Sequence, residues 1–113
     1  MNKMQTIVVQ VHRVPKSGAD ATVEVFRRLL QSLVPESKLQ CMDDADEGYV
    51  NLQFKSNNMV STWFRVLEEL AKDSATFDDL KRRWIVVAQG PHGWEDYKII
   101  AHHDPSVQID DIS

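Results

Sequence analysis

The sequence predicts an α+β fold in which two amphipathic helices cover one face of a largely antiparallel sheet. Short runs rich in β-branched residues alternate with two longer segments whose apolar residues recur at helical spacing. The 113 residues are enough for one domain that buries its own core without disulfides or metals. We therefore expect a single domain over residues 1–105, followed by an acidic and flexible tail over residues 106–113.

The first half of the chain is predicted to form a strand, a helix and a hairpin. Residues 5–13 are rich in valine and other β-branched residues, which favour a strand. A helix should span residues 19–33, because apolar side chains recur there at helical spacing until Pro35 ends the pattern. Residues 38–42 and 48–56 should then pair as an antiparallel hairpin across a short acidic loop.

The second half is predicted to add a long helix, a short helix and a second hairpin. The long helix should follow the capping residues 56–58 and end near Lys72. Its expected apolar stripe is Val60, Trp63, Phe64, Leu67 and Leu70. Thr76 is placed to cap a short helix that ends near Arg83. Strands over residues 84–89 and 94–103 complete the chain.

The order of these elements, β-α-β-β-α-β-β, predicts a ferredoxin-like split β-α-β sandwich with an added C-terminal strand. Strand alternation then leaves one face of the sheet without helices. The side chains expected on this open face are Val8, Gln10, His12, Tyr49, Asn51 and Gln53. Such a face is available to solvent, to a partner or to a second subunit, so a homodimer is compatible with the sequence.

The densest cluster of unusual chemistry lies in residues 90–104, which hold three of the four histidines, one of three tryptophans and one of two tyrosines. We expect a hairpin whose turn spans residues 90–93. Regular alternation would place Tyr97, Ile99 and Ala101 on one face of its second strand. Exposed aromatic residues flanked by charge are typical of protein-binding surfaces. The predicted partner-binding residues are His92, Trp94, Glu95, Asp96 and Tyr97, together with Asp43, Asp44, Asp46 and Glu47 of the acidic loop.

Charge is unevenly distributed along the chain. Residues 1–42 carry six Lys/Arg against three Asp/Glu, a net +3, whereas residues 43–113 carry seven against fourteen, a net −7. Nucleic-acid binding depends chiefly on Lys and Arg, so we expect no nucleic-acid partner. An acidic surface instead favours a protein partner with a basic surface.

No catalytic or cofactor motif stands out, which favours a non-enzymatic binding protein: an inhibitor, an immunity protein or a regulatory factor. Two alternatives remain open. One is a small-molecule or metal-dependent enzyme that uses His12, His102 and His103. The other is an RNA-binding sheet, although only Tyr49 on the open face is aromatic. We expect no cofactor and no metal, because adjacent histidines diverge along a strand and no helical His pair has the spacing of a zinc site.

The expected compartment is the cytoplasm. The lone Cys41 has no internal partner for a disulfide, as is usual in a reducing compartment. The N-terminal residues lack the cleavage site of a secretory signal. No apolar run approaches the roughly 20 residues that span a membrane, so we expect no membrane partner.

Overall fold

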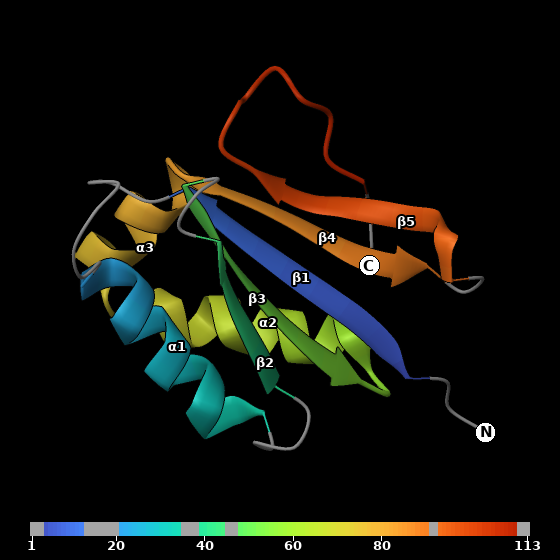
Figure 1. Cartoon of the computed structure of the whole chain (residues 1–113), viewed down its shortest axis with the longest axis horizontal. Coiled ribbons are helices and arrows are strands. Elements are labelled where there is room, and N and C mark those ends of the chain that lie inside the picture. The colour runs from blue at the N-terminus through green and yellow to red at the C-terminus, as the bar shows by residue number, and fades with distance from the viewer. Residues whose placement is uncertain (1–3, 13–20, 35–38, 45–47, 91–92, 111–113) are drawn as a thin grey trace.

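The computed structural model describes residues 4–12, 21–34, 39–44, 48–90 and 93–110 and has an α+β fold with a five-stranded antiparallel sheet and three helices (Figure 1). The elements are β1 (Gln5–His12), α1 (Ala21–Leu33), β2 (Leu39–Asp44), β3 (Tyr49–Ser56), α2 (Met59–Leu70), α3 (Ser74–Lys81), β4 (Trp84–Gly90) and β5 (Gly93–His102). None of the helices in these residues is long and apolar enough to cross a membrane.

The strands lie in the order β2-β3-β1-β4-β5, so β1 occupies the centre of the sheet. It pairs antiparallel with β3 on one side, where Val9 lies opposite Leu52, and with β4 on the other, where Val9 lies opposite Val86. The β2–β3 hairpin lies on one side of β1 and the β4–β5 hairpin on the other, so β2 and β5 are the edge strands. This order places β5, which carries Trp94, Tyr97 and His102, at one edge of the sheet.

The core lies between the helices and one face of the sheet. Every second residue of the three inner strands is buried there, as strand alternation requires. These residues are Ile7, Val9, Val11, Val50, Leu52, Phe54, Trp84, Val86 and Ala88. Phe26 and Trp63 pack edge-on or tilted against Trp84, with ring centroids 6.2 and 5.6 Å away. The burial of Trp63 that its place in the predicted apolar stripe implies is confirmed.

The facing of α2 differs from the prediction. Phe64, which was expected in the apolar stripe, is 49% exposed, and Leu67 is only partly buried at the margin of the core. The residues that α2 does bury are Met59, Trp63, Val66 and Leu70. These side chains recur every three or four residues, as the predicted ones do, but along a stripe rotated around the helix. The sequence of α2 therefore contains two overlapping apolar stripes, and the one that contains Val66 is buried against the sheet.

The caps of α2 and α3 show which polar residues begin each helix. Asn58 caps α2, because its side-chain oxygen accepts a hydrogen bond from Ser61 N at 3.2 Å. Asp73, and not the predicted Thr76, caps α3: its carboxylate accepts from the Thr76 backbone N–H at 3.2 Å and from the Thr76 hydroxyl at 2.8 Å. The helix therefore starts three residues earlier than the capping-box pattern suggested.

Candidate functional site

Strand β5 departs from regular pairing in two places. Its register against β4 shifts between Val86 and Val87, and again between Ala88 and Gly90. Ile99 consequently lies opposite Val87 on the open face, whereas Ala101 lies opposite Val86 on the core face. The expectation that Ile99 and Ala101 share one face was therefore wrong, because a β-bulge inserts an extra residue and resets the alternation.

At the second register shift, between Ala88 and Gly90, the backbone of β5 packs closely against Gly90. A β-carbon at Gly90 would collide with the carbonyl oxygen and the carboxylate of Asp96. Gly93, which follows the turn, has a φ of 90°, a conformation that favours glycine. The two glycines thus permit the close packing that positions residues 94–97.

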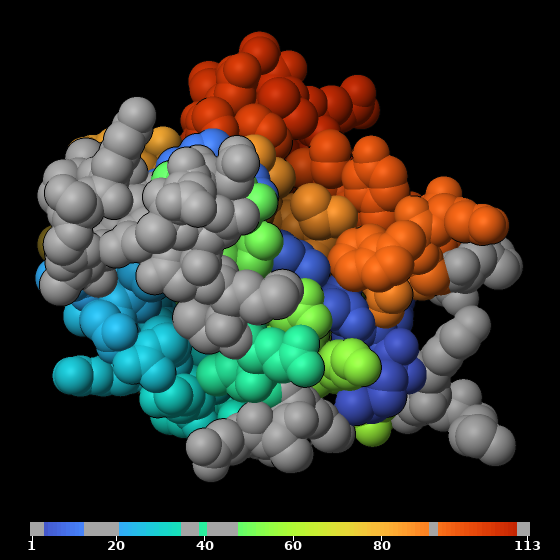
Figure 2. Space-filling view, in the orientation of Figure 1, coloured from blue at the N-terminus to red at the C-terminus, as the bar shows by residue number. Residues whose placement is uncertain are grey.

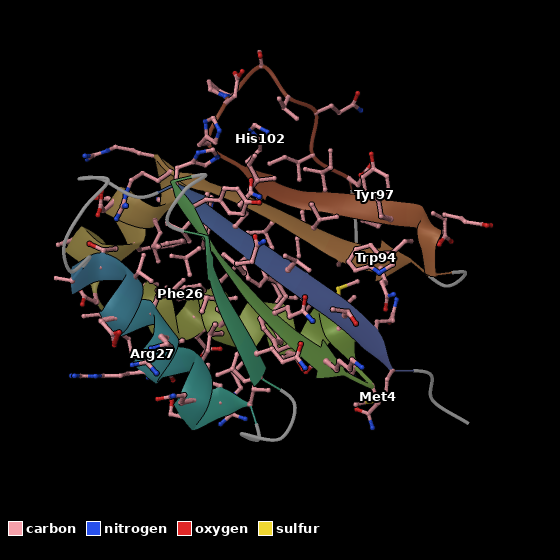
Figure 3. The ribbon with its side chains drawn as sticks, viewed as in Figure 1. Met4, Phe26, Arg27, Trp94, Tyr97 and His102 are labelled. Atoms are coloured by element: carbon pink, nitrogen blue, oxygen red, sulfur yellow. The ribbon has the colours of Figure 1, made fainter. Side chains whose placement is uncertain are left out.

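Trp94 and Tyr97 leave β5 in different directions (Figure 3). Trp94 reaches across β4 onto the open face of the sheet, whereas Tyr97 points away from β4. Their exposed fractions are 47% and 53%. Glu95 lies between them and is exposed, while Asp96 is half-buried against Gly90. Of the predicted contact residues on this strand, Trp94, Glu95 and Tyr97 are therefore available to a partner.

Trp94 forms one wall of a shallow hollow in the open face, with a volume of about 270 Å³. The other residues of this sheet hollow are Val8, Gln10, Asn51, Ile85 and Val87. The space-filling view shows β1 recessed between β5 and β3 (Figure 2). Trp94 therefore belongs both to the predicted contact residues of the C-terminal hairpin and to the open face of the sheet. The sequence suggested these as separate surfaces.

Sequence reasoning missed the contribution of β4 to the open face. Ile85 and Val87 point away from the core and line the hollow beside Val8, which lies directly opposite Val87. The signal was present, because Trp84 to Ala88 are all apolar. When the side chains on both faces of a strand are apolar, each face is either covered by other elements or available for contact.

Three histidines gather at the end of the sheet where β1 and β5 finish. The ring centroid of His103 lies 4.6 Å from that of His102 and 5.6 Å from that of His12. Strand β5 ends at His102, so the divergence expected of adjacent strand residues no longer separates His102 from His103. Within the described ranges, no group of three His, Cys, Asp or Glu side chains has the geometry to hold a metal ion.

The bend after β5 orders one of these histidines. Nδ1 of His102 accepts a hydrogen bond from the Asp104 backbone N–H at 2.9 Å, so in the neutral ring the proton is on Nε2 (His102 is labelled in Figure 3). The Asp104 carboxylate accepts hydrogen bonds from the Ser106 N–H at 2.9 Å and the Ser106 hydroxyl at 2.7 Å. These bonds, helped by the two adjacent histidines, hold the pKa of Asp104 below its ordinary value.

Arg83 ties the same end of the sheet to the helices. Its Nη1 donates to the His12 carbonyl at 2.7 Å, and its Nη2 donates to the Asp79 carboxylate at 2.8 Å. Thr22 of α1 donates to the same carboxylate at 2.7 Å. Arg83 is 8% exposed, and these bonds give it a structural role.

The segment after His103 turns back along the outer edge of β5. The Asp110 N–H donates to the Ile99 carbonyl at 2.8 Å, and the Asp110 carboxylate accepts from the Ile99 N–H at 2.8 Å. These bonds occupy backbone groups that an edge strand otherwise leaves unpaired. Part of the β5 edge is therefore closed to strand addition.

Several predicted contact residues lie outside the described part of the chain. These are His92 of the turn and Asp46 and Glu47 of the acidic loop. The backbone of Asp43 and Asp44 pairs with Val50 and Tyr49 at the end of β2, but their side chains are also outside the described part. The acidic loop therefore stays a prediction.

Comparisons with known proteins add no family to this geometry. No family model matches the chain, and neither a curated protein nor a solved structure is similar to it. Function must therefore be argued from the site itself.

Proposed function

We propose that this protein is a non-enzymatic binding module that acts by protein–protein contact, as an inhibitor, an immunity protein or a regulatory factor. The observation that supports this proposal is the exposed side of β5. Tyr97 is 53% exposed, Trp94 is 47% exposed, and the exposed Glu95 lies between them. Large aromatic side chains on a rigid strand, flanked by charge, are the features of binding hot spots.

The charge distribution favours a basic partner. Residues 43–113, which include β5, carry a net charge of −7. An acidic surface attracts a basic protein over distances of about a Debye length, roughly 8–10 Å, and so accelerates encounter. Once the partner is docked, burial of Tyr97 and Trp94 supplies contact area that charge alone does not.

The strand order supports a finer assignment of the fold. The antiparallel order β2-β3-β1-β4 within the sheet supports a ferredoxin-like split β-α-β sandwich, with β5 added at the β4 edge. The lone Cys41 supports a reducing compartment, and we propose the cytoplasm as the location.

The test of the binding surface compares matched variants in a capture experiment from native extract. Glu95→Lys and Tyr97→Ala remove the charge and the aromatic ring of the β5 surface. Glu68→Lys and Phe64→Ala make the same changes on α2, where both residues are exposed and Phe64 is 49% exposed. Each β5 variant should weaken capture at least tenfold, about 1.4 kcal/mol, with an unchanged melting temperature.

Equal loss of capture in the α2 variants, or no loss in the β5 variants, contradicts the proposed surface. Asp96 is a poor probe because it packs against Gly90. Trp94 is also a poor probe, because it lines the sheet hollow and its removal alters two surfaces at once.

The histidine cluster favours a second candidate function, a small-molecule or metal-dependent site. His12 ends β1, His102 ends β5, and the ring centroid of the following His103 lies 5.6 Å from that of His12 and 4.6 Å from that of His102. Calorimetric titration with Zn²⁺, and thermal unfolding with and without a chelator, distinguish the two functions. Stoichiometric binding that is lost in His103→Ala establishes this site. The binding-module proposal expects no stoichiometric uptake and no change in melting temperature on chelation.

A further inference from the structure

The centre of the open face has the composition of an interface core. The sheet hollow, formed by Val8, Gln10, Asn51, Ile85, Val87 and Trp94, contains four apolar side chains, two amides and no charged group. The chain as a whole is 27% charged, so this is a local depletion. The centres of protein interfaces are depleted in charge and enriched in aromatic residues in the same way.

We propose that this face binds a second copy of the same chain, so that the two sheets pack face to face around a twofold axis. A twofold interface brings each residue near its own counterpart, which makes like charges near the axis repulsive. The hollow has no such charge. Its amides are self-complementary, because each carries both a donor and an acceptor and can pair with the same group of the other copy.

The side-chain oxygen of Asn51 supports the proposal that a second copy covers the open face. Its Oδ1 is buried and has no hydrogen-bond partner among the residues that the structure describes. An unsatisfied buried acceptor costs about 1–3 kcal/mol. By contrast, the amides of Gln53 and Gln40, farther toward the β2 edge, bond each other at 2.8 Å. Rotation of the Asn51 amide turns its oxygen into the hollow, where an amide N–H of a second copy satisfies it.

The area of the face is sufficient for a dimer. Five strands, of which the central ones have eight residues, cover roughly 600 Å² at about 4.8 Å between strands and 3.3 Å per residue. Two copies then bury on the order of 1,200 Å², the lower limit of specific, stable interfaces. Sheets that pack face to face lie about 10 Å apart, a distance that side chains of this size fill.

Other occupants fit less well. A small molecule usually occupies a cavity of about 300–1,000 Å³ that encloses most of its surface. The hollow is smaller, at about 270 Å³, and is open on the outer side. A basic protein finds no carboxylate among the residues that line the hollow. The exposed Glu95 of β5 belongs to the surface assigned above to a heterologous partner.

The test is the mass of the full chain in solution, measured by sedimentation over a concentration series. Val87→Asp places a carboxylate in the hollow, opposite Val8 of β1. Val25→Asp makes the same change on α1, where Val25 is 41% exposed. Wild-type protein and Val25→Asp should form the dimer, and Val87→Asp should associate at least tenfold more weakly.

Gln10→Glu provides a second variant in case Val87→Asp does not fold. It changes the side-chain volume little and adds a charge that meets its own counterpart across the axis, so it should also weaken the dimer, and more so at low salt. A wild-type chain that is monomeric throughout the series overturns the proposal. So does a dimer that persists in folded Val87→Asp or in Gln10→Glu.

The dimer face and the exposed side of β5 share Trp94, but Glu95 and Tyr97 lie outside the sheet hollow and Gln10 lies within it. Glu95→Lys and Tyr97→Ala should leave the dimer intact, whereas Gln10→Glu should leave the exposed side of β5 intact. Loss of capture in Gln10→Glu contradicts the separate β5 surface, and loss of the dimer in Glu95→Lys or Tyr97→Ala contradicts the dimer face.

Discussion

Leu70 and Phe64 show how single positions on one helix divide between core and surface. Both belonged to the apolar stripe predicted for α2, but Leu70 is fully buried and Phe64 is 49% exposed. Leu70→Ala should lower the free energy of unfolding by about 2–5 kcal/mol, because it leaves a cavity in the core. Phe64→Ala should change it by no more than about 0.5 kcal/mol.

Urea denaturation followed by fluorescence measures both variants. A midpoint that shifts for Phe64→Ala as much as for Leu70→Ala shows that α2 packs with a different face. Sequence periodicity could identify the helix and the burial of Trp63. It could not choose between two overlapping stripes, because that choice depends on which stripe packs against β1 and β3.

Arg83 shows a second limit at the scale of single residues. In the sequence it belongs to the run Lys81-Arg82-Arg83 beside a helix end, where cations are commonly found on the surface. In the structure its guanidinium joins β1 to α3 through the His12 carbonyl and Asp79. Local spacing does not distinguish Arg83 from Arg82, because the partner that ties Arg83 to the sheet, the His12 carbonyl, lies 71 residues away along the chain.

At the scale of elements, the strands and helices could be predicted within a few residues, but the pairing of β5 could not. Strict alternation of side chains between the two faces requires each residue of β5 to pair with one residue of β4. The two register shifts in this pairing interrupt the alternation. The shift near Gly90 depends on backbone contact with Asp96. Sequence alone shows a glycine at a turn and does not reveal what lies against it.

Gly90→Ala tests this contact. The added methyl group meets the Asp96 carbonyl oxygen, so the start of β5 must move, and we expect a loss of about 1–3 kcal/mol in stability. Truncation of the Asp96 side chain in the same protein should not restore stability, because the nearest clash is with the backbone. Chemical denaturation of both variants gives the measurement, and full recovery in the Gly90→Ala/Asp96→Ala double variant contradicts the account.

At the scale of the whole molecule, the α+β class and the antiparallel sheet are confirmed. They could be predicted because element order and alternation are local properties of the sequence. The sheet hollow could not be predicted in full, because it combines residues of β1, β3, β4 and β5 that only the strand order brings together.

The open face also bears on nucleic-acid binding. Tyr49 is the one aromatic side chain expected there from β1 and β3, and the hollow has no Lys or Arg to neutralise phosphate. We expect no binding of short single-stranded RNA or DNA at physiological salt in a fluorescence titration. Micromolar binding that weakens steeply with salt and is lost in Tyr49→Ala establishes an RNA-binding sheet instead.

The central claim is that the exposed side of β5 contacts a protein partner. Hydrogen–deuterium exchange of the free chain and of the captured complex tests it most directly, because it locates the contact along the chain. We expect slower exchange in the complex than in the free chain for peptides that cover Gly93–His102, and unchanged exchange in α1 and α2. Protection confined to the helices, with β5 exchanging as in the free chain, contradicts it.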